Sequence, residues 1–276
     1  MKKPILTKEN YYDDNFYMST SRFKNYITCE SRAVAIDNGA WEDKSKPIAL
    51  TVGNYIHSYF EGFEAHETFV QQYEKRIFKS NGDKCADFIQ ADKCIVTLEN
   101  DFYFMRKYNG EFGDNVQKEL IVTGNLEGLD FKGRIDSINL TRSYFVDLKT
   151  MRSIRSNDIF SPMLHRRVPQ IVYNVYEYYY HLQMYIYQQL VQQEYGCFTP
   201  YIAAVSKEEI PDKEFVLMDE TVLANGKQIF ESHVERVKQV LLGIAEPKKC
   251  GICDWCRHTK EITRPVTLSE IVTGDK

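Results

Sequence analysis

The segment from residue 133 to residue 150, GRIDSINLTRSYFVDLKT, constrains the fold more than any other part of the chain. It predicts two adjacent β-strands. In residues 146–150, VDLKT, side chains alternate between the two faces of the strand, so Asp147 and Lys149 share one face and their apolar neighbours share the other. Asp136 lies on the preceding strand. The segment therefore predicts two carboxylates and an ammonium group that converge at a strand end.

Two carboxylates beside a lysine suit a Mg²⁺ site that cleaves phosphodiesters. Asp136 and Asp147 offer hard oxygen ligands. A bound divalent ion lowers the pKa of a water ligand and neutralises phosphate charge, and Lys149 is placed to orient the nucleophile. An Asp and a Lys two residues apart are often only a solvated strand face. Asp147, however, lies among apolar residues, where an unpaired carboxylate would be costly to bury.

Other polar residues are candidates for the same site. His57 lies on an otherwise apolar predicted helix, and its imidazole either completes a metal's coordination or is an ordinary core residue. Gln183 and Tyr187, four residues apart on a long predicted helix, share one face and either serve the site or pack. Glu119 opens the strand before that of Asp136, and is equally well explained as an outer ligand or as an exposed strand-edge charge.

A cysteine cluster near the end of the chain is the second strong signal. Cys250, Cys253 and Cys256 have the spacing C-x2-C-x2-C, at which thiolates share one soft metal ion or a cluster. A closed site needs a fourth ligand. Cys29, at the end of the N-terminal predicted helix, is the leading candidate, and His258 is the alternative that would give a Cys3His zinc site. Reduced thiols without metal remain the third interpretation.

Composition limits the class of protein. Seven cysteines, an odd number, argue against a disulfide framework. The N-terminus has no apolar region of a secretory signal, and no apolar run is long enough to span a bilayer, so we expect a cytoplasmic protein. A net charge of -4 means that a nucleic-acid enzyme of this sequence needs a local basic groove rather than a basic body.

Periodicity predicts one α/β domain with a mixed central sheet flanked by helices. We expect three parts: an N-terminal arm and helix (1–48), a core (49–218), and a C-terminal helix with the cysteine cluster (219–276). Helices are predicted from Ser19 or Ser21 onward, and over 49–62, 86–106, 171–193 and 220–244. Strands are predicted over 119–123, 129–140, 143–149, 201–207 and 214–218, with a turn at 124–125 and an irregular basic loop over 151–169.

These positions together resemble the PD-(D/E)XK nucleases, with Asp136 as the first acid and residues 147–149 as the D-x-K half. The position of His57 resembles that of a helix histidine in RecB-family nucleases, and Gln183 with Tyr187 resembles their Q-x-x-x-Y motif. The likeness to phage proteins related to the RecE exonuclease domain extends over nearly the whole chain. It is carried by LTKENYY (6–12), YMS (17–19), CE (29–30), VGNYIH (52–57), YIAAV (201–205) and CGICDWCRHTK (250–260).

The resemblance implies a Mg²⁺-dependent (or Mn²⁺-dependent) exonuclease that degrades one strand of linear duplex DNA from the 5′ end. It implies a metal held by Asp136, Asp147, His57 and the Leu148 carbonyl. It also implies a RecT-like annealing partner in phage-type homologous recombination and, as in some relatives, a ring-shaped oligomer. An endonuclease for branched or single-stranded DNA and a non-catalytic DNA- or partner-binding module are the alternatives.

The cysteines add a further resemblance. Cys29 with a C-terminal triplet is similar to the iron–sulfur staple of some RecB-like nucleases, such as the AddB nuclease domain and CRISPR-associated relatives. Their usual C-terminal spacing is C-x2-C-x5-C, from which this chain departs. The resemblance implies a structural [4Fe-4S] cluster at Cys29, Cys250, Cys253 and Cys256, with structural Zn²⁺ as the alternative.

Overall fold

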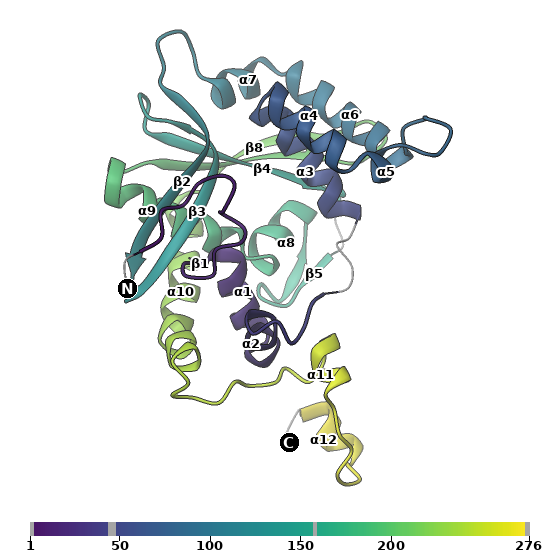
Figure 1. The fold of residues 1–276 in the computed structure, drawn as a ribbon, viewed down its shortest axis with the longest axis vertical. Coiled ribbons are helices and arrows are strands. Elements are labelled where there is room, and N and C mark those ends of the chain that lie inside the picture. The colour runs from purple at the N-terminus through teal and green to yellow at the C-terminus, as the bar shows by residue number, and fades with distance from the viewer. Residues whose placement is uncertain (1–2, 44–47, 157–158, 274–276) are drawn as a thin grey trace.

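The computed structural model describes residues 3–43, 48–156 and 159–273, and its centre is a mixed six-stranded sheet (Figure 1). The strands follow the order β1-β3-β4-β7-β8, and β2 pairs with the other edge of β3. β1 runs parallel to β3 and β4 parallel to β7, whereas the remaining pairs are antiparallel. Their bounds are β1 Met18–Ser19, β2 Val116–Leu126, β3 Leu129–Asn139, β4 Tyr144–Met151, β7 Thr199–Ser206 and β8 Lys213–Leu217.

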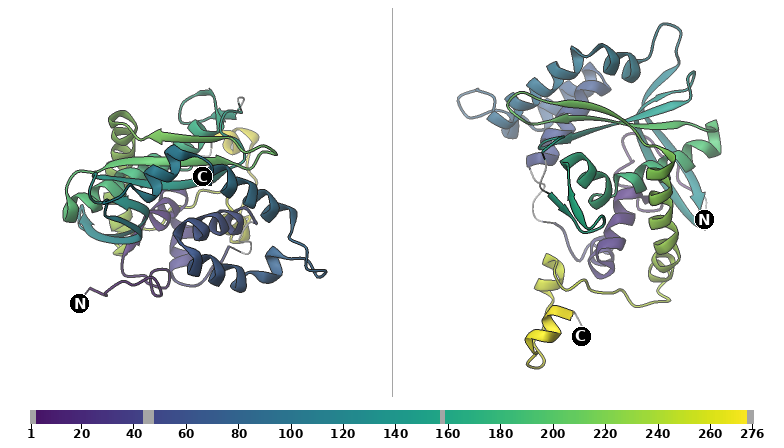
Figure 2. Two further views of the ribbon diagram at one scale, coloured as in Figure 1. Left: turned by 90° about the horizontal axis from the view of Figure 1, so that it is seen from above. Right: turned by 180° about the vertical axis from the view of Figure 1, so that it is seen from behind.

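Helices cover both faces of this sheet, which confirms the predicted α/β class (Figures 1 and 2). One apolar core joins the sheet to α3, α6 and α7, and a second joins its other face to α1, α9 and α10. The β4 residues Val146 and Leu148 enter the first core, and Phe145 enters the second, as the predicted alternation requires. The helices are α1 Thr20–Thr28, α2 Glu30–Asp37, α3 Ile48–Glu61, α4 Phe63–Gln72, α5 Glu74–Ile77, α6 Ala86–Glu99, α7 Phe102–Asn109, α8 Gln170–Glu177, α9 Tyr180–Tyr195, α10 Glu220–Leu241, α11 Asp254–His258 and α12 Leu268–Thr273.

Three helices that the sequence predicted as continuous are divided. The predicted helix 86–106 separates into α6 and α7, because the Asp101 carboxylate caps α7 by accepting a hydrogen bond from the Phe104 amide. The predicted helix 171–193 separates into α8 and α9 at Tyr179, whose φ of 55° lies in the left-handed region. The N-terminal helix separates into α1 and α2 at Cys29, which is extended.

The turn between β2 and β3 was also predicted in the wrong place. The sequence indicated residues 124–125, but Gly124 and Asn125 are paired within the hairpin. The chain instead turns at Glu127 and Gly128, whose φ values of 49° and 84° are those of a two-residue hairpin turn. β2 is therefore longer than predicted, and the position of the turn sets the register that places Glu119.

Two further segments differ from the sequence-based expectation. The loop predicted over 151–169 contains a small antiparallel hairpin, β5 Ile159–Ser161 with β6 Arg166–Val168; residues 157–158 lie outside the described part of the chain. The short helices α4 and α5 follow α3 without having been predicted. Among the described residues no helix is both long and apolar enough to cross a membrane.

Candidate functional site

The sheet opens along one edge of β3, between the strands that pair with it there. β1 pairs with Phe131 and Lys132, and β4 pairs with β3 from Ser137 onward. Ser137 is opposite Val146, so the next positions along the two strands are Asp136 and Asp147, where the ladder has already ended. Asp136 and Asp147 thus lie where β3 and β4 diverge, so the backbone groups of these two residues do not pair with each other.

A third carboxylate lies at the same level on β2. Leu120 pairs with Ile135, so Glu119 lies opposite Asp136. Glu119 has a φ of 55°, which interrupts regular pairing at this point and is costly for a residue other than glycine. Glu119, Asp136 and Asp147 are 4%, 8% and 3% exposed. Three buried acids on three neighbouring strands repel one another and need cations to be stable.

Asp136 is held by a backbone amide and by a histidine. The Leu148 N–H donates to Asp136 Oδ2 at 2.7 Å, and His57 Nδ1 lies 3.3 Å from the same oxygen. Burial alone would raise the pKa of Asp136, but His57 and Lys149 outweigh it and lower that pKa. Burial likewise opposes protonation of His57, yet the Asp136 charge raises the His57 pKa. Gly53, one turn before His57 on α3, lies close to β4: a Cβ added to Gly53 would lie 3.3 Å from Thr150 Oγ1.

Two buried carboxylates and the partly exposed His57 imidazole form a group that could hold a metal. One ligand atom each from His57, Glu119 and Asp136 lies within 4.8 Å of the other two. Two carboxylates and an imidazole are donors that suit Mg²⁺ or Mn²⁺. The repulsion between the two opposed carboxylates gives a physical reason for a cation there, so the residues present fit a divalent ion. The sequence placed Asp136 and His57 together, and the structure does too.

Asp147 has different partners. It does not belong to the group formed by His57, Glu119 and Asp136. Its Oδ1 accepts a hydrogen bond from Gln183 Nε2 at 2.9 Å, and its Oδ2 lies 2.6 Å from Lys149 Nζ. Burial and the nearby charge of Asp136 raise the Asp147 pKa, while Lys149 opposes this shift. The Lys149 pKa is raised by Asp147 against the effect of burial, so Lys149 is a cation at neutral pH.

The two polar residues predicted on one helix face lie on α9 and face the sheet. Gln183 donates to Asp147, so it orients a site carboxylate. Tyr187 is buried against Gly133 of β3: a Cβ added to Gly133 would lie 2.9 Å from Tyr187 Cε1. Gly133 is therefore needed for the close approach of α9 to β3 beside Asp136.

Glu119 is the residue that sequence reasoning undervalued. It is buried rather than an exposed strand-edge charge, and its Oε2 lies 2.6 Å from Arg134 Nε. Burial and the charge of Asp136 raise the Glu119 pKa to about 7, against the pull of Arg134. A turn placed correctly at Glu127 and Gly128 would have given the register and with it the Glu119–Asp136 pair.

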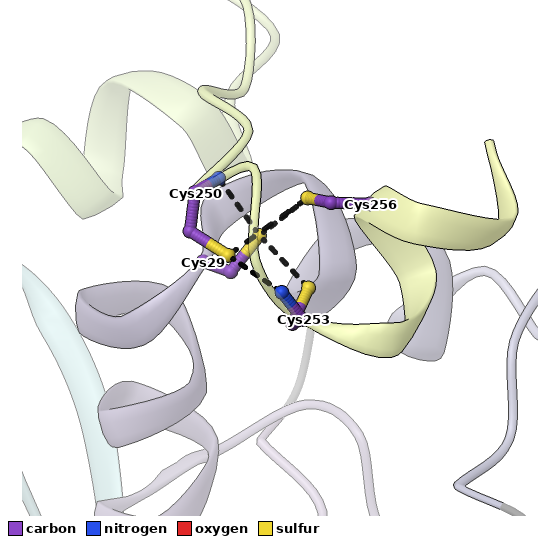
Figure 3. A group of neighbouring side chains, drawn as sticks. All are labelled: Cys29, Cys250, Cys253 and Cys256. Atoms are coloured by element: carbon purple, nitrogen blue, oxygen red, sulfur yellow. Dashed lines mark hydrogen bonds between the residues drawn. The ribbon is translucent and has the colours of Figure 1, made fainter. Parts of the chain in front are cut away.

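The four cysteines of the predicted cluster come together, with Cys29 as the fourth member (Figure 3). Cys29 Sγ lies 3.6 Å from Cys256 Sγ and 3.8 Å from Cys253 Sγ, and Cys250 Sγ lies 3.9 Å from Cys256 Sγ. The alternative ligand His258 is not part of the group and packs against Trp41, with ring centroids 5.4 Å apart. This cluster of thiols can hold a metal.

The sulfur separations bear on the kind of metal. Four sulfurs around one tetrahedral ion with bonds of about 2.3 Å lie roughly 3.8 Å apart, and the observed separations of 3.6, 3.8 and 3.9 Å match that value. In a four-iron cluster each cysteine binds a different iron, so the sulfurs must lie further apart. Backbone amides of Ile252 and Cys253 donate to Cys250 and lower its pKa to about 7, against the effect of burial, which favours a thiolate there.

Contacts around the cysteines join the two ends of the chain independently of any metal. The Glu30 carboxylate, next to Cys29, pairs with Arg236 of α10 at 2.7 Å and accepts from the Lys248 amide. Trp255 Nε1 donates to Ser31 Oγ at 2.9 Å. The start of α2 is thus fixed against the C-terminal segment.

Residues 19–259 match the model of a protein family described as a PDDEXK-like domain of unknown function (DUF3799). A crystal structure of a protein from Eubacterium rectale, described as a "putative exonuclease", has a TM-score of 0.86 and 31% identity, covering 99% of this chain and 100% of that one. The crystal structure of SSO0001 covers 90% of this chain and 96% of its own, but with 15% identity and a TM-score of 0.30. The comparison with curated proteins gave no match.

Proposed function

The chain belongs to the family of PDDEXK-like domains (DUF3799), which confirms the predicted PD-(D/E)XK core, and we propose that it is a divalent-metal-dependent nuclease that hydrolyses phosphodiester bonds of DNA. The observation that carries this proposal is the row of Glu119, Asp136 and Asp147 across three strands, with Lys149 beside it. We also propose that residues 1–276 act as one nuclease domain.

Each residue of the site has a part in the proposed reaction. Glu119, Asp136 and His57 would hold Mg²⁺ or Mn²⁺, and Asp147 and the Leu148 carbonyl stay proposed ligands as well. When bound, such an ion lowers the pKa of a water ligand and neutralises charge on the phosphate.

The protein's own side chains supply orientation. Lys149 is protonated, so it donates hydrogen bonds to the attacking water or to a phosphate oxygen, and it does not act as the base. Gln183 fixes the Asp147 carboxylate with which Lys149 pairs. Tyr187 supports this arrangement by packing α9 against Gly133.

We further propose that the enzyme is an exonuclease that acts on linear duplex DNA from 5′ to 3′. Two observations support this: the E. rectale protein is described as a putative exonuclease, and the sequence resembles RecE-related proteins. The same resemblance supports a part in phage-type recombination with a RecT-like annealing protein, and a ring-shaped oligomer.

Two DNA substrates and a matched variant test the proposed activity. Purified protein is incubated with 5′-labelled linear duplex and with closed circular duplex, in Mg²⁺ or Mn²⁺ and then in EDTA. Asp136→Asn is the control, because the amide oxygen can still accept the Leu148 N–H while one metal-binding charge is lost. Metal-dependent loss of the linear DNA alone supports the exonuclease. Cutting of the circle would indicate an endonuclease, and no cleavage by folded protein would favour a binding module.

We propose that the four cysteines hold a metal centre with a structural role. The resemblance favours [4Fe-4S], whereas the sulfur separations favour a single tetrahedral ion such as Zn²⁺. Metal and sulfide analysis with a visible spectrum of anaerobically purified protein separates the two. Protein that binds neither iron nor zinc at these thiols would contradict the proposal.

A further inference from the structure

A second lysine approaches the proposed active site from a different element. Lys24 lies on α1, and its ammonium lies 5.6 Å from the centre of the Tyr180 ring. Lys149 Nζ lies 4.9 Å from the centre of the same ring. Two cations, one from the N-terminal helix and one from β4, thus converge on the first residue of α9.

Lys149 has a counter-ion, whereas Lys24 has none among the residues that the structure describes. Lys149 pairs with Asp147 at 2.6 Å. Among residues 3–43, 48–156 and 159–273, no carboxylate pairs with the Lys24 ammonium and no acceptor takes a hydrogen bond from it. Burial and then the charge of Lys149 lower the Lys24 pKa to about 7, against the opposing effect of the Asp147 charge. A half-buried ammonium beside another cation is unfavourable unless an anion joins them.

The rest of α1 gives this lysine a fixed position. Ser19, which caps α1, pairs with Lys132 of β3, and Cys29 at the other end belongs to the cysteine cluster. Thr20 lies one turn before Lys24 on the same side of the helix; it is 4% exposed and its hydroxyl has no partner within the described ranges. Among the described residues, this side of α1 therefore carries an ammonium without an ion pair and a hydroxyl without a hydrogen bond.

We propose that Lys24 binds a phosphate group of the nucleic-acid strand bound at the active site, on the side of Tyr180 and Lys149. The inference rests on the proposed nuclease function and adds a substrate contact that lies outside the carboxylate, lysine and Q-x-x-x-Y motifs. An ammonium is a point charge that suits a phosphate oxygen without requiring a fixed orientation. The contact also supplies part of the local basic surface that a chain of net charge -4 needs in order to bind DNA.

The phosphate has two possible sources, an internal phosphodiester or the monoester at a 5′ end. Labelled linear duplexes with a 5′-phosphate or a 5′-hydroxyl distinguish them. Binding is measured by fluorescence anisotropy in Mg²⁺ over a range of salt concentrations, in an Asp136→Asn background that prevents turnover. The variants compared in this background are Lys24→Met, Lys24→Arg, and Lys227→Met. Lys227 is the matched control, because it is an exposed lysine of α10 that pairs with Glu231.

Lys24→Met lacks the contact, so it should bind DNA roughly three- to tenfold more weakly than the parent at moderate salt. Its slope of log Kd against log salt should be smaller by about 0.9. Lys24→Arg should keep most of the affinity and slope, and Lys227→Met should match the parent. Loss on both duplexes assigns an internal phosphate, and loss on the 5′-phosphorylated duplex alone assigns the terminal one. Affinity and salt slope unchanged in Lys24→Met, or no binding by the parent even at low salt, would overturn the inference.

The test separates this inference from the proposed function. Cleavage is assayed apart, with the native Asp136 in place. If the protein cleaves DNA and Lys24→Met binds DNA as tightly as the parent does, only the proposed phosphate contact is refuted. If the protein binds DNA through Lys24 but does not cleave it, only the proposed nuclease function is refuted. Thermal unfolding of each variant excludes loss of folding as the cause of weaker binding.

Discussion

Glu119 lies opposite Asp136 across strands β2 and β3, and both carboxylates are buried. Arg134 pairs with Glu119, and the His57 imidazole lies beside Asp136, so each acid has a basic side chain on one side. Like charges opposed across a ladder destabilise a sheet. The protein tolerates them here together with a left-handed backbone at Glu119, which indicates that the pair serves a purpose other than stability.

The first prediction concerns the metal affinity of this pair. Glu119→Gln keeps the size of the side chain but removes one of the two opposed charges. We expect Mg²⁺ or Mn²⁺ affinity and nuclease activity to fall by at least about 100-fold, since even indirect partners of metal ligands contribute 10–100-fold. Isothermal titration with Mn²⁺ and initial cleavage rates measure the two effects.

A neighbouring acid provides the control for that variant. Glu61→Gln removes a charge from the end of α3, where Glu61 pairs with Lys8 at 2.7 Å. It should leave metal affinity within about twofold, because surface ion pairs contribute little. Equal metal affinity in Glu119→Gln and the parent would remove Glu119 from the proposed ligands.

The second prediction is a dependence of stability on pH in metal-free protein. The Glu119 pKa is raised from 4.5 to about 7, by burial first and then by Asp136. Between these values the folded state binds more protons than the unfolded chain, so the free energy of unfolding falls as pH rises through this range. The free energy of unfolding of the parent should therefore fall between about pH 5 and pH 7.5. That of Glu119→Gln should fall by about 1–3 kcal/mol less over the same range.

Urea unfolding in EDTA at the two ends of that range measures the difference. Divalent metal should remove it, because a bound cation stabilises the ionised carboxylate. The same loss of stability with pH in both proteins would show that Glu119 ionises normally in the fold.

The third prediction separates charge from position at Lys149. Lys149→Met leaves Asp147 buried without its ion pair, at a cost of about 3–5 kcal/mol, because their atoms lie only 2.6 Å apart. Lys149→Arg keeps the charge, so it should keep most of the stability while still losing activity through its different shape. Thermal unfolding and cleavage rates are compared for both. An active Lys149→Arg would mean that only the charge of Lys149 matters.

The sequence was most informative where residues alternate along one strand. Asp147 and Lys149 share a face of β4 as predicted, because a strand's period of two follows from backbone geometry alone. The Glu119–Asp136 pair depends instead on where a hairpin turns, and Gly124-Asn125 resembled a turn as much as Glu127-Gly128 does. An error of three residues in the turn left Glu119 undervalued.

Tertiary contacts explain the other differences. Tyr179 divides α8 from α9 by taking a left-handed conformation that helix periodicity does not indicate. Lys24 gave no signal in the sequence, because a lysine on an amphipathic helix is ordinarily a solvated residue. Its place beside Lys149 arises from the packing of α1 against α9 and the sheet, which no local pattern encodes.

The fourth prediction tests the contact between Gly133 and Tyr187. In Gly133→Ala, the new methyl group would lie 2.9 Å from the tyrosine ring, so α9 or the ring must move. We expect a loss of about 1–3 kcal/mol from overpacking, and lower activity because Gln183 on the same helix moves away from Asp147. Combining it with Tyr187→Leu should cost less than the sum of the two single changes. Additive effects in urea unfolding would show that the two residues do not compete for space.

The fifth prediction links the cysteine cluster to DNA binding through α1. Cys253→Ser removes a thiol whose sulfur lies 3.8 Å from that of Cys29, so we expect loss of the bound metal. The melting temperature should fall by roughly 5–10 °C, since a tightly bound ligand contributes several kcal/mol. Because Cys29 ends the helix that carries Lys24, DNA affinity should also fall, whereas Cys197→Ser, at an exposed thiol outside the cluster, should change neither property. A metal-free Cys253→Ser protein with full DNA affinity would show that Glu30 and Ser31 hold α1 in place without the metal.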